Sequence, residues 1–400
     1  MSSTSSIWEP VYAIAPKTAR RLMEIEKARV EVEHTPLPLT AQAELRRQAR
    51  VRSTHYSTRI EGNRLTLAEA EKVVRGTRTA FHGRERDVRE VRNYWNALIR
   101  VEEGAEAKRP VTEEAVRRLH ALVERGPRAR PSPWRDGQNV VRDSGSGAIV
   151  YLPPEARDVP GLMAALVRWI REAENSGVPV PLIAGLAHYQ FVTIHPYYDG
   201  NGRTARLLAT WLLHRGGYGL HGFLSVEEYH ARDLAGYYRA LAVHPHHNYY
   251  EGRADAELTS WVEYFVATLA ETFEAVRREA RRLAVGTVPP SGTVPSCRST
   301  AAAPPAGVPA EPEPLRKLDR RARIALALFA RTERIASADV ARALGLSERM
   351  ARVLLAQWVK AGWLVVADPS RRKRAYALTA IYRQYIGNLS AMPRRTTGKD

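Results

Sequence analysis

The chain has 400 residues, enough for two or three domains, and 44% of them are hydrophobic, which is typical of a folded protein. Its single cysteine, Cys297, excludes an internal disulfide framework and a multi-thiolate metal site. No apolar run approaches the length of a membrane span, and the N-terminus lacks the basic and apolar stretches of a secretory signal. We therefore expect a cytoplasmic protein with no membrane partner.

The formal net charge is +18, and most of it lies at one end of the chain. Residues 316–400 hold nineteen Lys or Arg and six Asp or Glu, so +13 falls there and +5 on the first 315 residues. A basic excess confined to one end indicates a polyanion partner for that end alone.

The first 280 residues predict a mostly helical structure, because apolar positions recur at helical spacing. The expected helices span 17–33, 40–59, 112–125, 159–176, 181–194, 204–215, 227–241 and 256–280. Residues 138–152 differ, because two short β-favouring runs flank a Gly/Ser turn. That pattern predicts a β-hairpin.

Residues 285–315 are rich in Pro and Ala and cannot bury a core, so we interpret them as a linker. Residues 316–390 then predict a compact unit with helices at 320–331, 338–344 and 348–360 and strands at 363–367 and 374–378. Ser347 is placed to cap the third of these helices. The expected layout is a helical region over 1–110, a core over 111–284, the linker and the basic C-terminal unit.

The segment Gly200-Asn201-Gly202 lies between two expected helices, and all three residues tolerate a positive φ. We expect a loop that opens the second helix, where exposed backbone N–H groups attract anions. Arg203 and Arg206 follow three residues apart, on similar faces of that helix. Two cations at a helix N-terminus oppose its dipole, unless an anion with several charges binds between them.

His195 and Asp199 directly precede this loop. A carboxylate beside a phosphate site usually requires a metal ion between them, and Mg²⁺ takes carboxylate and phosphate oxygens together. A histidine at such a site can accept a proton from a hydroxyl group. The combination predicts a site for a magnesium-bound polyphosphate with a base beside it.

Residues 195–206, with the sequence HPYYDGNGRTAR, resemble the motif His-Pro-Phe-x-Asp/Glu-Gly-Asn-Gly-Arg-x-x-Arg of the Fic family. Tyr197 stands where the family has Phe, and a buried Tyr needs room or a partner for its hydroxyl. The wider resemblance covers roughly residues 40–280. It implies a mostly α-helical Fic bundle with a β-hairpin flap, and transfer of AMP from ATP to a Ser, Thr or Tyr hydroxyl of a protein, with self-modification included.

The resemblance also implies roles for individual residues. His195 would deprotonate the target hydroxyl and Asp199 would hold Mg²⁺. The loop residues Gly200, Asn201 and Gly202 would cradle the α- and β-phosphates. Arg203 would contact the β-phosphate and Arg206 the γ-phosphate.

Two further groups of residues receive roles from the same resemblance. Tyr237 and Tyr238 would lie near the adenine, although packing between helices explains them equally well. The hairpin tip would hold the target segment by strand addition, through Ala148, Ile149, Val150 and Tyr151.

Ser57 and Glu61 are four residues apart, on one face of an expected helix, and Glu61 directly precedes Gly62-Asn63, a signal that ends helices. A carboxylate at a helix C-terminus is unfavourable unless a cation meets it. The segment resembles the Fic inhibitory helix, Ser/Thr-x-x-x-Glu-Gly/Asn, here at about 45–63. The resemblance implies that Glu61 pairs with Arg206 and displaces the γ-phosphate.

The C-terminal unit resembles a winged helix-turn-helix over about residues 318–386. Its expected recognition helix carries Arg349 and Arg352, and residues 371–374 lie at the tip of the wing. Such residues commonly contact phosphates and base edges. The candidate DNA-binding residues are therefore Arg349, Arg352, Arg371, Arg372, Lys373 and Arg374, although a winged helix can equally dock a protein or form a homodimer.

Two alternatives to an adenylyltransferase stay open from the sequence. The chain could be a DNA-binding transcriptional regulator whose Fic domain senses a ligand or is weakly active. It could also be a Fic enzyme that uses another nucleotide or removes AMP. The motif does not separate these chemistries.

Overall fold

A computed structural model provides the structure of the chain. It describes residues 8–76, 81–142, 147–285, 318, 322, 325, 326, 328, 329, 332–344, 347–368, 370 and 374–387. The chain divides into two compact units: unit 1 comprises residues 1–36 and 44–287, and unit 2 comprises residues 37–43 and 288–400. The expected linker, 285–315, falls almost wholly outside the described residues.

Unit 1 is helical, as the periodicity predicts. Its helices are α1 (Pro16–His34), α2 (Leu39–Ile60, from Glu44 onward), α3 (Leu67–Val74), α4 (Glu85–Glu106), α5 (Glu113–Arg125), α6 (Val159–Asn175), α7 (Val180–Ile194), α8 (Asn201–Arg215), α9 (Val226–Arg232), α10 (Leu234–Leu241) and α11 (Thr259–Val285). Short 3₁₀ turns span Leu220–Gly222 and Tyr249–Glu251.

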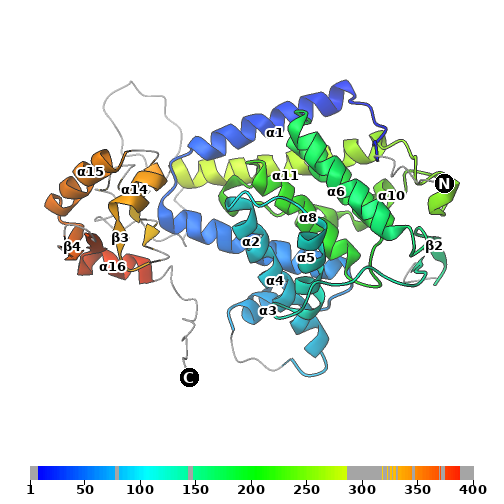
Figure 1. Ribbon diagram of the computed structural model, residues 1–400, viewed down its shortest axis with the longest axis horizontal. Helices are drawn as coiled ribbons and strands as arrows, with labels where there is room; N and C mark the ends of the chain where they lie inside the picture. The colour runs from blue at the N-terminus through cyan, green and yellow to red at the C-terminus, as the bar shows by residue number, and fades with distance from the viewer. Residues whose placement is uncertain are drawn as a thin grey trace, which may run out of the picture. The chain divides into compact units, whose positions relative to one another are not determined.

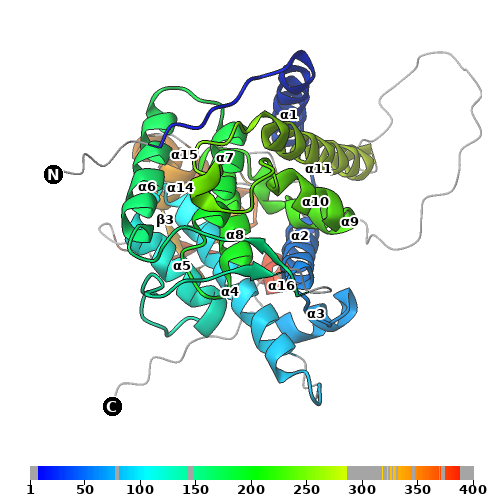
Figure 2. The ribbon, with the colours of Figure 1, turned by 90° about the vertical axis from the view of Figure 1, so that its right-hand side faces the viewer.

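Helix α8 lies in the interior of unit 1 and packs against α4, α5 and α7, as Figure 2 shows. Its residues from Asn201 to Leu213 are buried almost without exception, so the helix that begins at the candidate loop is also the core of the bundle. Helices α1 and α11 lie side by side along one edge (Figure 1). This packing fixes the start of α8 against three neighbouring helices.

The predicted hairpin is present and antiparallel. Strand β1 (Val141–Arg142) pairs with β2 (Ile149–Tyr151), with Val141 opposite Tyr151. The turn at 143–146 lies outside the described residues. Backbone hydrogen bonds of Leu152 with His247 and Tyr249 tie the end of this two-stranded ribbon to the rest of unit 1.

Three features of unit 1 differ from the sequence-based expectation. Helix α8 begins at Asn201 rather than at residue 204. Of the loop residues Gly200, Asn201 and Gly202, only Gly200 takes the left-handed conformation (φ 76°), and it serves as the N-cap. The helix expected over 227–241 breaks at Asp233, whose side chain accepts from the backbone of Gly236 and starts α10. Helices α3 and α4 were not expected. They contain many charged residues, so the helical spacing of their apolar residues is difficult to recognise in the sequence.

Unit 2 contains the helices α14 (Ser337–Leu344), α15 (Glu348–Lys360) and α16 (Ala380–Gly387). Ser347 caps α15 by accepting from the backbone of Met350, as its position predicts. Strands β3 (Ile335–Ala336), β4 (Leu364–Asp368) and β5 (Ala375–Leu378) form an antiparallel sheet in the order β3-β5-β4. β3 and α16 were not expected, and the helix expected over 320–331 lies mostly outside the described residues.

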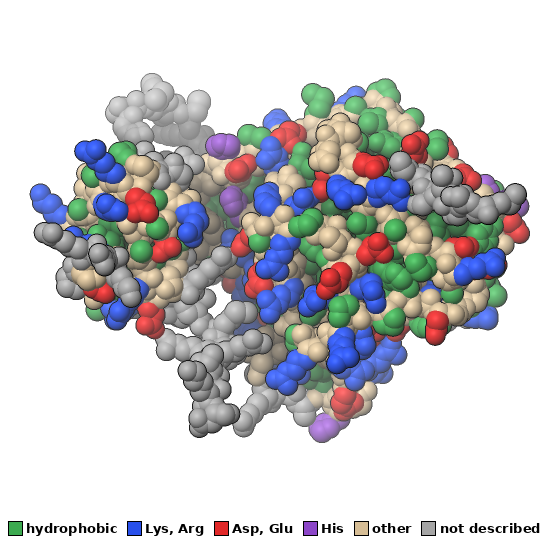
Figure 3. Space-filling view, in the orientation of Figure 1, with side chains coloured by type: hydrophobic (Ala, Val, Ile, Leu, Met, Phe, Trp, Pro, Cys, Tyr) green, Lys and Arg blue, Asp and Glu red, His purple; other side chains and the backbone are tan. Residues whose placement is uncertain are grey.

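The visible face of unit 1 mixes basic and acidic side chains and shows no broad region of one charge (Figure 3). None of the helices in the described part of the chain is both long enough and apolar enough to span a membrane.

Candidate active site

The candidate motif forms the connection between α7 and α8. His195 is the C-cap of α7 and adopts the left-handed conformation (φ 50°, ψ 59°), which is unusual for a residue with a side chain. Gly200 adopts the same conformation at the other end of the connection. The two turns bring the imidazole and the N-terminus of α8 together. The first N–H groups of α8 have no partner within the helix and remain available to an anion.

The imidazole of His195 is held as a neutral group. Burial lowers the pKa of His195 to about 4, although a contact with the Val192 carbonyl and the nearby Glu61 act in the opposite direction. Its Nδ1 lies 3.2 Å from the Val192 carbonyl oxygen, so a proton on Nδ1 leaves Nε2 free as an acceptor. At neutral pH the ring can therefore accept a proton.

Asn201 does not direct its side chain at a ligand. Its Oδ1 accepts from the backbone N–H of Tyr197 at 3.0 Å, and its Nδ2 donates to the Tyr197 carbonyl at 2.8 Å. The residue is 3% exposed. Both ends of the amide therefore stabilise the loop, and only the backbone N–H of Asn201 can serve the expected phosphate contact.

Tyr197 occupies the position where the family has Phe. Its ring stacks on His120 with 3.5 Å between centroids and packs against Trp134. The hydroxyl is buried and has no hydrogen-bond partner in the described part of the chain. The fold thus provides room for the ring and leaves the hydroxyl unpaired.

Arg206 is bound from three sides by the end of α2. Its Nε donates to the hydroxyl of Ser57 at 2.8 Å, and its Nη2 donates to the Ser57 carbonyl at 2.9 Å. Nη2 also donates to Oε1 of Glu61 at 2.8 Å. Burial tends to lower the pKa of Arg206, but Glu61, Tyr237 and Tyr94 outweigh it and the net shift is upward. Arg206 is therefore a buried permanent cation whose partner is the carboxylate of Glu61.

The same carboxylate lies against the glycine-rich loop. A Cβ added to Gly202 would come within 2.2 Å of Oε1 of Glu61. Because Gly202 has no side chain, Glu61 reaches the backbone that would otherwise face a phosphate. The carboxylate thus lies between the loop and Arg206.

Arg203 is also buried, and it is surrounded by carboxylates. Its Nη2 lies 2.9 Å from Oε1 of Glu124 and 3.3 Å from Oδ1 of Asp199, and its Nη1 lies 4.0 Å from Oε1 of Glu90. Burial raises the pKa of Glu124, and Arg203 opposes that shift. The two motif arginines are thus each paired with a glutamate from another helix.

Asp199 fits a cation that is shared with phosphates. Its side chain is 61% exposed, and its carboxylate accepts from the Gly200 N–H at 2.7 Å and lies 3.6 Å from Arg86. No cluster of three or more potential metal ligands occurs among the described residues. A single exposed carboxylate suits Mg²⁺ only if nucleotide oxygens and water supply the remaining ligands, which is the usual arrangement for this ion.

The two tyrosines expected near the base have different environments. Tyr237 is 2% exposed, and its hydroxyl contacts Nε2 of His188 at 3.1 Å within a cluster of aromatic rings. Tyr238 is 49% exposed, and its hydroxyl donates to the Ile60 carbonyl, at the end of α2, at 3.4 Å. Only Tyr238 is therefore accessible to a base, while Tyr237 belongs to the core beside Arg206.

The hairpin residues divide in a similar way. Ala148, Ile149 and Val150 are exposed, with 49% for Ile149 and 37% for Val150. Tyr151 is buried, and its hydroxyl donates to the Thr193 carbonyl at 2.6 Å. Tyr151 thus anchors the hairpin beside the end of α7, and the three residues before it are accessible to another chain.

Three residues that the sequence did not single out support the site. Arg135 is buried and donates to the carbonyl oxygens of His195, Gly137 and Pro154, which ties the strained end of α7 to the base of the hairpin. Nε2 of His120 lies 2.9 Å from the Asp199 carbonyl oxygen. Glu124 pairs with Arg203. These contacts join segments far apart in the chain, so no local sequence pattern predicts them.

The candidate DNA-binding residues lie in unit 2. Arg349 and Arg352 are exposed on α15, where Arg352 pairs with Glu348 at 2.9 Å, and Arg374 is exposed at the start of β5. The remaining three, residues 371–373, lie outside the described residues. On α15 the exposed face also carries Met350 and Val353, which are 50% and 53% exposed.

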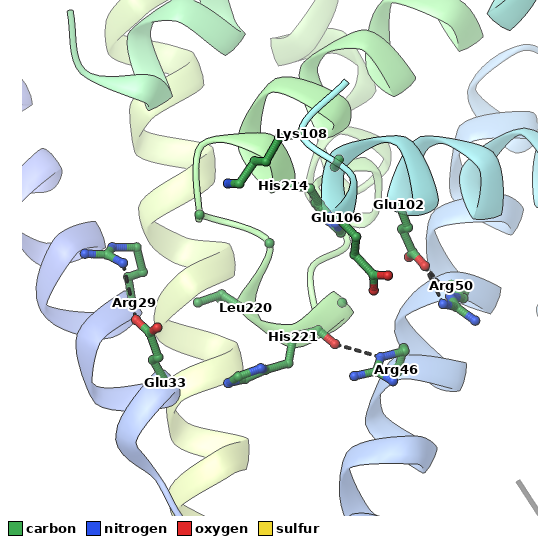
Figure 4. A pocket seen from close by; sticks show the side chains of 14 residues that line it. Arg29, Glu33, Arg46, Arg50, Glu102, Glu106, Lys108, His214, Leu220 and His221 are labelled. Carbon is green, nitrogen blue, oxygen red and sulfur yellow. Dashed lines mark hydrogen bonds and ion pairs between the residues drawn. The ribbon is translucent and has the colours of Figure 1, made fainter. Parts of the chain in front are cut away.

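A cavity of about 320 Å³ elsewhere in unit 1 has a charged lining that contains no residue of the motif (Figure 4). The charges face one another: Arg29 pairs with Glu33 at 3.3 Å, and Arg50 pairs with Glu102. Nε of Arg46 donates to the His221 carbonyl at 2.8 Å. With its cations already engaged in this way, the cavity does not compete with the motif as a site for a polyphosphate.

Comparison with known proteins agrees with this geometry. Residues 110–213 match the model of the Fic/DOC family, and this match contains the whole of α5, α7 and the motif. A crystal structure of a Fic family protein from Desulfovibrio desulfuricans superposes with a TM-score of 0.55 at 26% identity, and it covers 93% of this chain and 99% of that one. Residues 110–213 therefore form a Fic/DOC domain.

Curated Fic relatives carry the name protein adenylyltransferase Fic. The one from Drosophila virilis is 30% identical over 203 residues, which is 50% of this chain and 40% of that protein. The one from Drosophila melanogaster is 32% identical over 177 residues, which is 43% of this chain and 34% of that protein. The chain thus spans well under half the length of these Fic relatives, and the match supports a transferase of the nucleotidyl class.

Proposed function

We propose that this chain transfers AMP from ATP to a hydroxyl group of a protein and that Glu61 holds it inactive in the state described. The observation that carries the proposal is the double contact of the Glu61 carboxylate, which pairs with Arg206 at 2.8 Å and lies against Gly202. An anion occupies the position at which the family chemistry requires a phosphate. The neutral imidazole of His195 lies at the same loop.

The reaction follows from these residues. The target hydroxyl gives its proton to Nε2 of His195, and its oxygen attacks the α-phosphorus of ATP. A new bond forms between this oxygen and the α-phosphorus. The bond between the α-phosphorus and the oxygen that bridges to the β-phosphorus breaks, and pyrophosphate leaves. Because such transfer depends mainly on position and charge, the N–H groups of α8, Arg203 and Arg206 supply most of the stabilisation. Mg²⁺ at Asp199 would neutralise charge on the phosphates.

The exposed edge of the hairpin is suited to present the hydroxyl. Ile149 and Val150 are exposed along β2, and pairing of an extended target segment with such a strand demands little of the target sequence. Tyr151 fixes that edge to the end of α7, next to His195. Tyr238 is the accessible ring for the adenine, and it contacts the inhibitory helix at Ile60.

Incubation with labelled ATP, GTP, CTP and UTP, followed by mass spectrometry, tests the proposal. We expect Glu61→Gly to raise self-modification at least tenfold with ATP, because Arg206 and the loop are then free for the phosphates. Introducing His195→Ala into that variant should abolish transfer while binding of ATP persists. Labelling by a nucleotide other than ATP, or retained transfer without His195, contradicts the proposal in its stated form.

The matched control is Glu114→Gly. Glu114 is an exposed glutamate on α5 that pairs only with Arg118 in the described structure. This variant should leave self-modification at the level of the unmodified chain. If it raises labelling as much as Glu61→Gly does, the effect is a general loosening of the fold and not release of Arg206.

We further propose that unit 2 binds duplex DNA through α15. The supporting observations are its net charge and the exposure of Arg349, Arg352, Met350 and Val353 on one helix. Arginines reach phosphates and guanine edges, and apolar side chains contact thymine methyl groups. Fluorescence anisotropy with a labelled duplex should show affinity that falls with salt, and replacing both arginines by Ala should lower the salt slope by about 2. No binding at low salt would exclude this second function.

A further inference from the structure

The two glycines of the loop each face a glutamate, and each glutamate pairs with one of the two motif arginines. Glu61 lies against Gly202 and pairs with Arg206. On the other side, a Cβ added to Gly200 would come within 2.4 Å of Oε1 of Glu124. That same oxygen lies 2.9 Å from Nη2 of Arg203. The second pair has no counterpart in the motif, because α5 supplies it from a distant part of the chain.

The surroundings of Arg203 determine which carboxylate can hold it during the reaction. The side chain of Arg203 is only 3% exposed, so it needs a fixed counter-charge. Asp199 is one neighbour, but the proposed function requires it for the metal ion. Glu90 is the other, at 4.0 Å, and it already accepts from Arg86 at 2.8 Å and from Asn63 at 2.9 Å. Glu124 is the neighbour that remains.

The position of Glu124 is suited to fixing the direction of the guanidinium. Glu124 lies on α5, which packs directly against α8, and Nδ2 of Asn93 donates to its carbonyl oxygen at 3.1 Å. Its Oε1 is buried and lies 2.9 Å from Nη2 of Arg203, and of the charges that act on the Glu124 carboxyl, Arg203 has the largest effect. The absence of a side chain at Gly200 allows that oxygen to reach the loop.

On the basis of the proposed function, we infer that Glu124 is a positioning residue for transfer: its carboxylate holds the Arg203 guanidinium against the loop after Asp199 turns to the metal ion. Glu124 does not touch the nucleotide itself. Its removal should therefore leave the nucleotide bound but its phosphates misaligned, and a misplacement of about 1 Å can cost about 100-fold in rate.

Steady-state kinetics in a Glu61→Gly background tests the inference. We expect Glu124→Gln to lower kcat by about 10- to 100-fold and to change KM for ATP less than about threefold. In an Arg203→Ala background, the same substitution should change kcat less than twofold, because Glu124 then has nothing to position. Glu124→Asp should recover part of the lost kcat, since it restores the charge.

Controls separate the outcomes. Glu114→Gln makes the same chemical change on an exposed part of α5 and should not alter kcat, and thermal unfolding checks that each variant is folded. Equal losses of kcat with and without Arg203 would assign Glu124 a purely structural role and overturn the inference. So would a rise in kcat, which would make Glu124 a second inhibitory carboxylate. If the Glu61→Gly parent transfers nothing, the proposed function itself fails, and the inference fails with it.

Discussion

Individual side chains at the loop pair two glycines with two glutamates. Gly200 and Gly202 leave space at their α-carbons, and a glutamate fills each space. Each glutamate neutralises an arginine that would otherwise be a buried, unpaired cation. Under the proposed function, these carboxylates occupy the positions that phosphates of ATP would take.

Tyr197 offers a test of side-chain energetics beside this site. Its buried hydroxyl has no hydrogen-bond partner among the residues that the structure describes, and an unsatisfied buried polar group costs about 1–3 kcal/mol. We expect Tyr197→Phe to raise the free energy of unfolding by about 1 kcal/mol and to retain transfer activity. Urea denaturation measures the change.

A matched substitution provides the contrast. The hydroxyl of Tyr94 is also buried, but it donates to Oε1 of Glu227 at 3.0 Å. Tyr94→Phe should therefore lower the free energy of unfolding by about 1 kcal/mol or more. If both substitutions destabilise the chain equally, the environment attributed to Tyr197 is incorrect.

At the scale of elements, the end of α2 holds the side chain of Arg206 through several hydrogen bonds. Ser57 contributes two of the three hydrogen bonds to Arg206, one through its hydroxyl and one through its carbonyl. Ser57→Ala removes the hydroxyl and leaves Nε of Arg206 buried without that acceptor. We expect self-modification between that of the unmodified chain and that of Glu61→Gly.

The same labelling assay measures this effect. In a Ser57→Ala and Glu61→Gly double variant, the serine change should add little, because both residues act on Arg206 and their effects should not be additive. Activity of Ser57→Ala equal to that of the unmodified chain would show that the carboxylate alone maintains inhibition.

Elements with strong local signals were predicted well, and elements defined by packing were not. The start of α15 follows from Ser347, and the start of α5 follows from Thr112, whose side chain accepts from the backbone of Ala115. In contrast, the true start of α8 depends on the left-handed backbone of Gly200 alone. The break between α9 and α10 depends on the turn at Asp233. The apolar residues keep their helical spacing across this turn, so the sequence pattern does not predict the break.

The candidate site shows the same division. Local patterns identified the motif and Glu61, and the resemblance to the Fic inhibitory helix implied the Arg206–Glu61 pair that the structure contains. The sequence did not identify Arg135, His120 or Glu124, whose contacts with the loop exist only after α5, α7 and α8 pack together. For Tyr237 the sequence left a place near the adenine and packing between helices equally open, and the ring is buried in the core.

At the scale of the whole molecule, buried histidines predict sensitivity to mild acid. Burial lowers the pKa of His120, His195 and His214 to about 4 and that of His230 to about 3, and it places the pKa of His188 well below the ordinary value. Unfolded histidines bind protons near pH 6.5. Between pH 6.5 and about 4 the unfolded state therefore takes up more protons, and stability falls as the pH falls.

We expect the melting temperature to drop steadily between pH 7 and 5, with on the order of 1–2 kcal/mol lost per histidine. Burial raises the pKa of the carboxyl groups of Glu102, Glu124 and Glu227, so their protonation favours the folded state as the pH falls and does not account for the loss. His230→Gln should make the decline less steep, and His82→Gln, at an exposed position, should not. A melting temperature that stays constant down to pH 5 would contradict this expectation.

The close approach of Glu61 to Gly202 restricts how the chain could lose its inhibition by mutation. A side chain at position 202 would displace the Glu61 carboxylate, but it would also block the phosphates sterically. Substitution of Arg206 would likewise release Glu61 and remove the γ-phosphate contact in the same step. Of the residues in this contact, Glu61 is the one whose loss unlocks the enzyme without disabling it, so variants with constitutive activity should arise on the inhibitory helix and not on the loop.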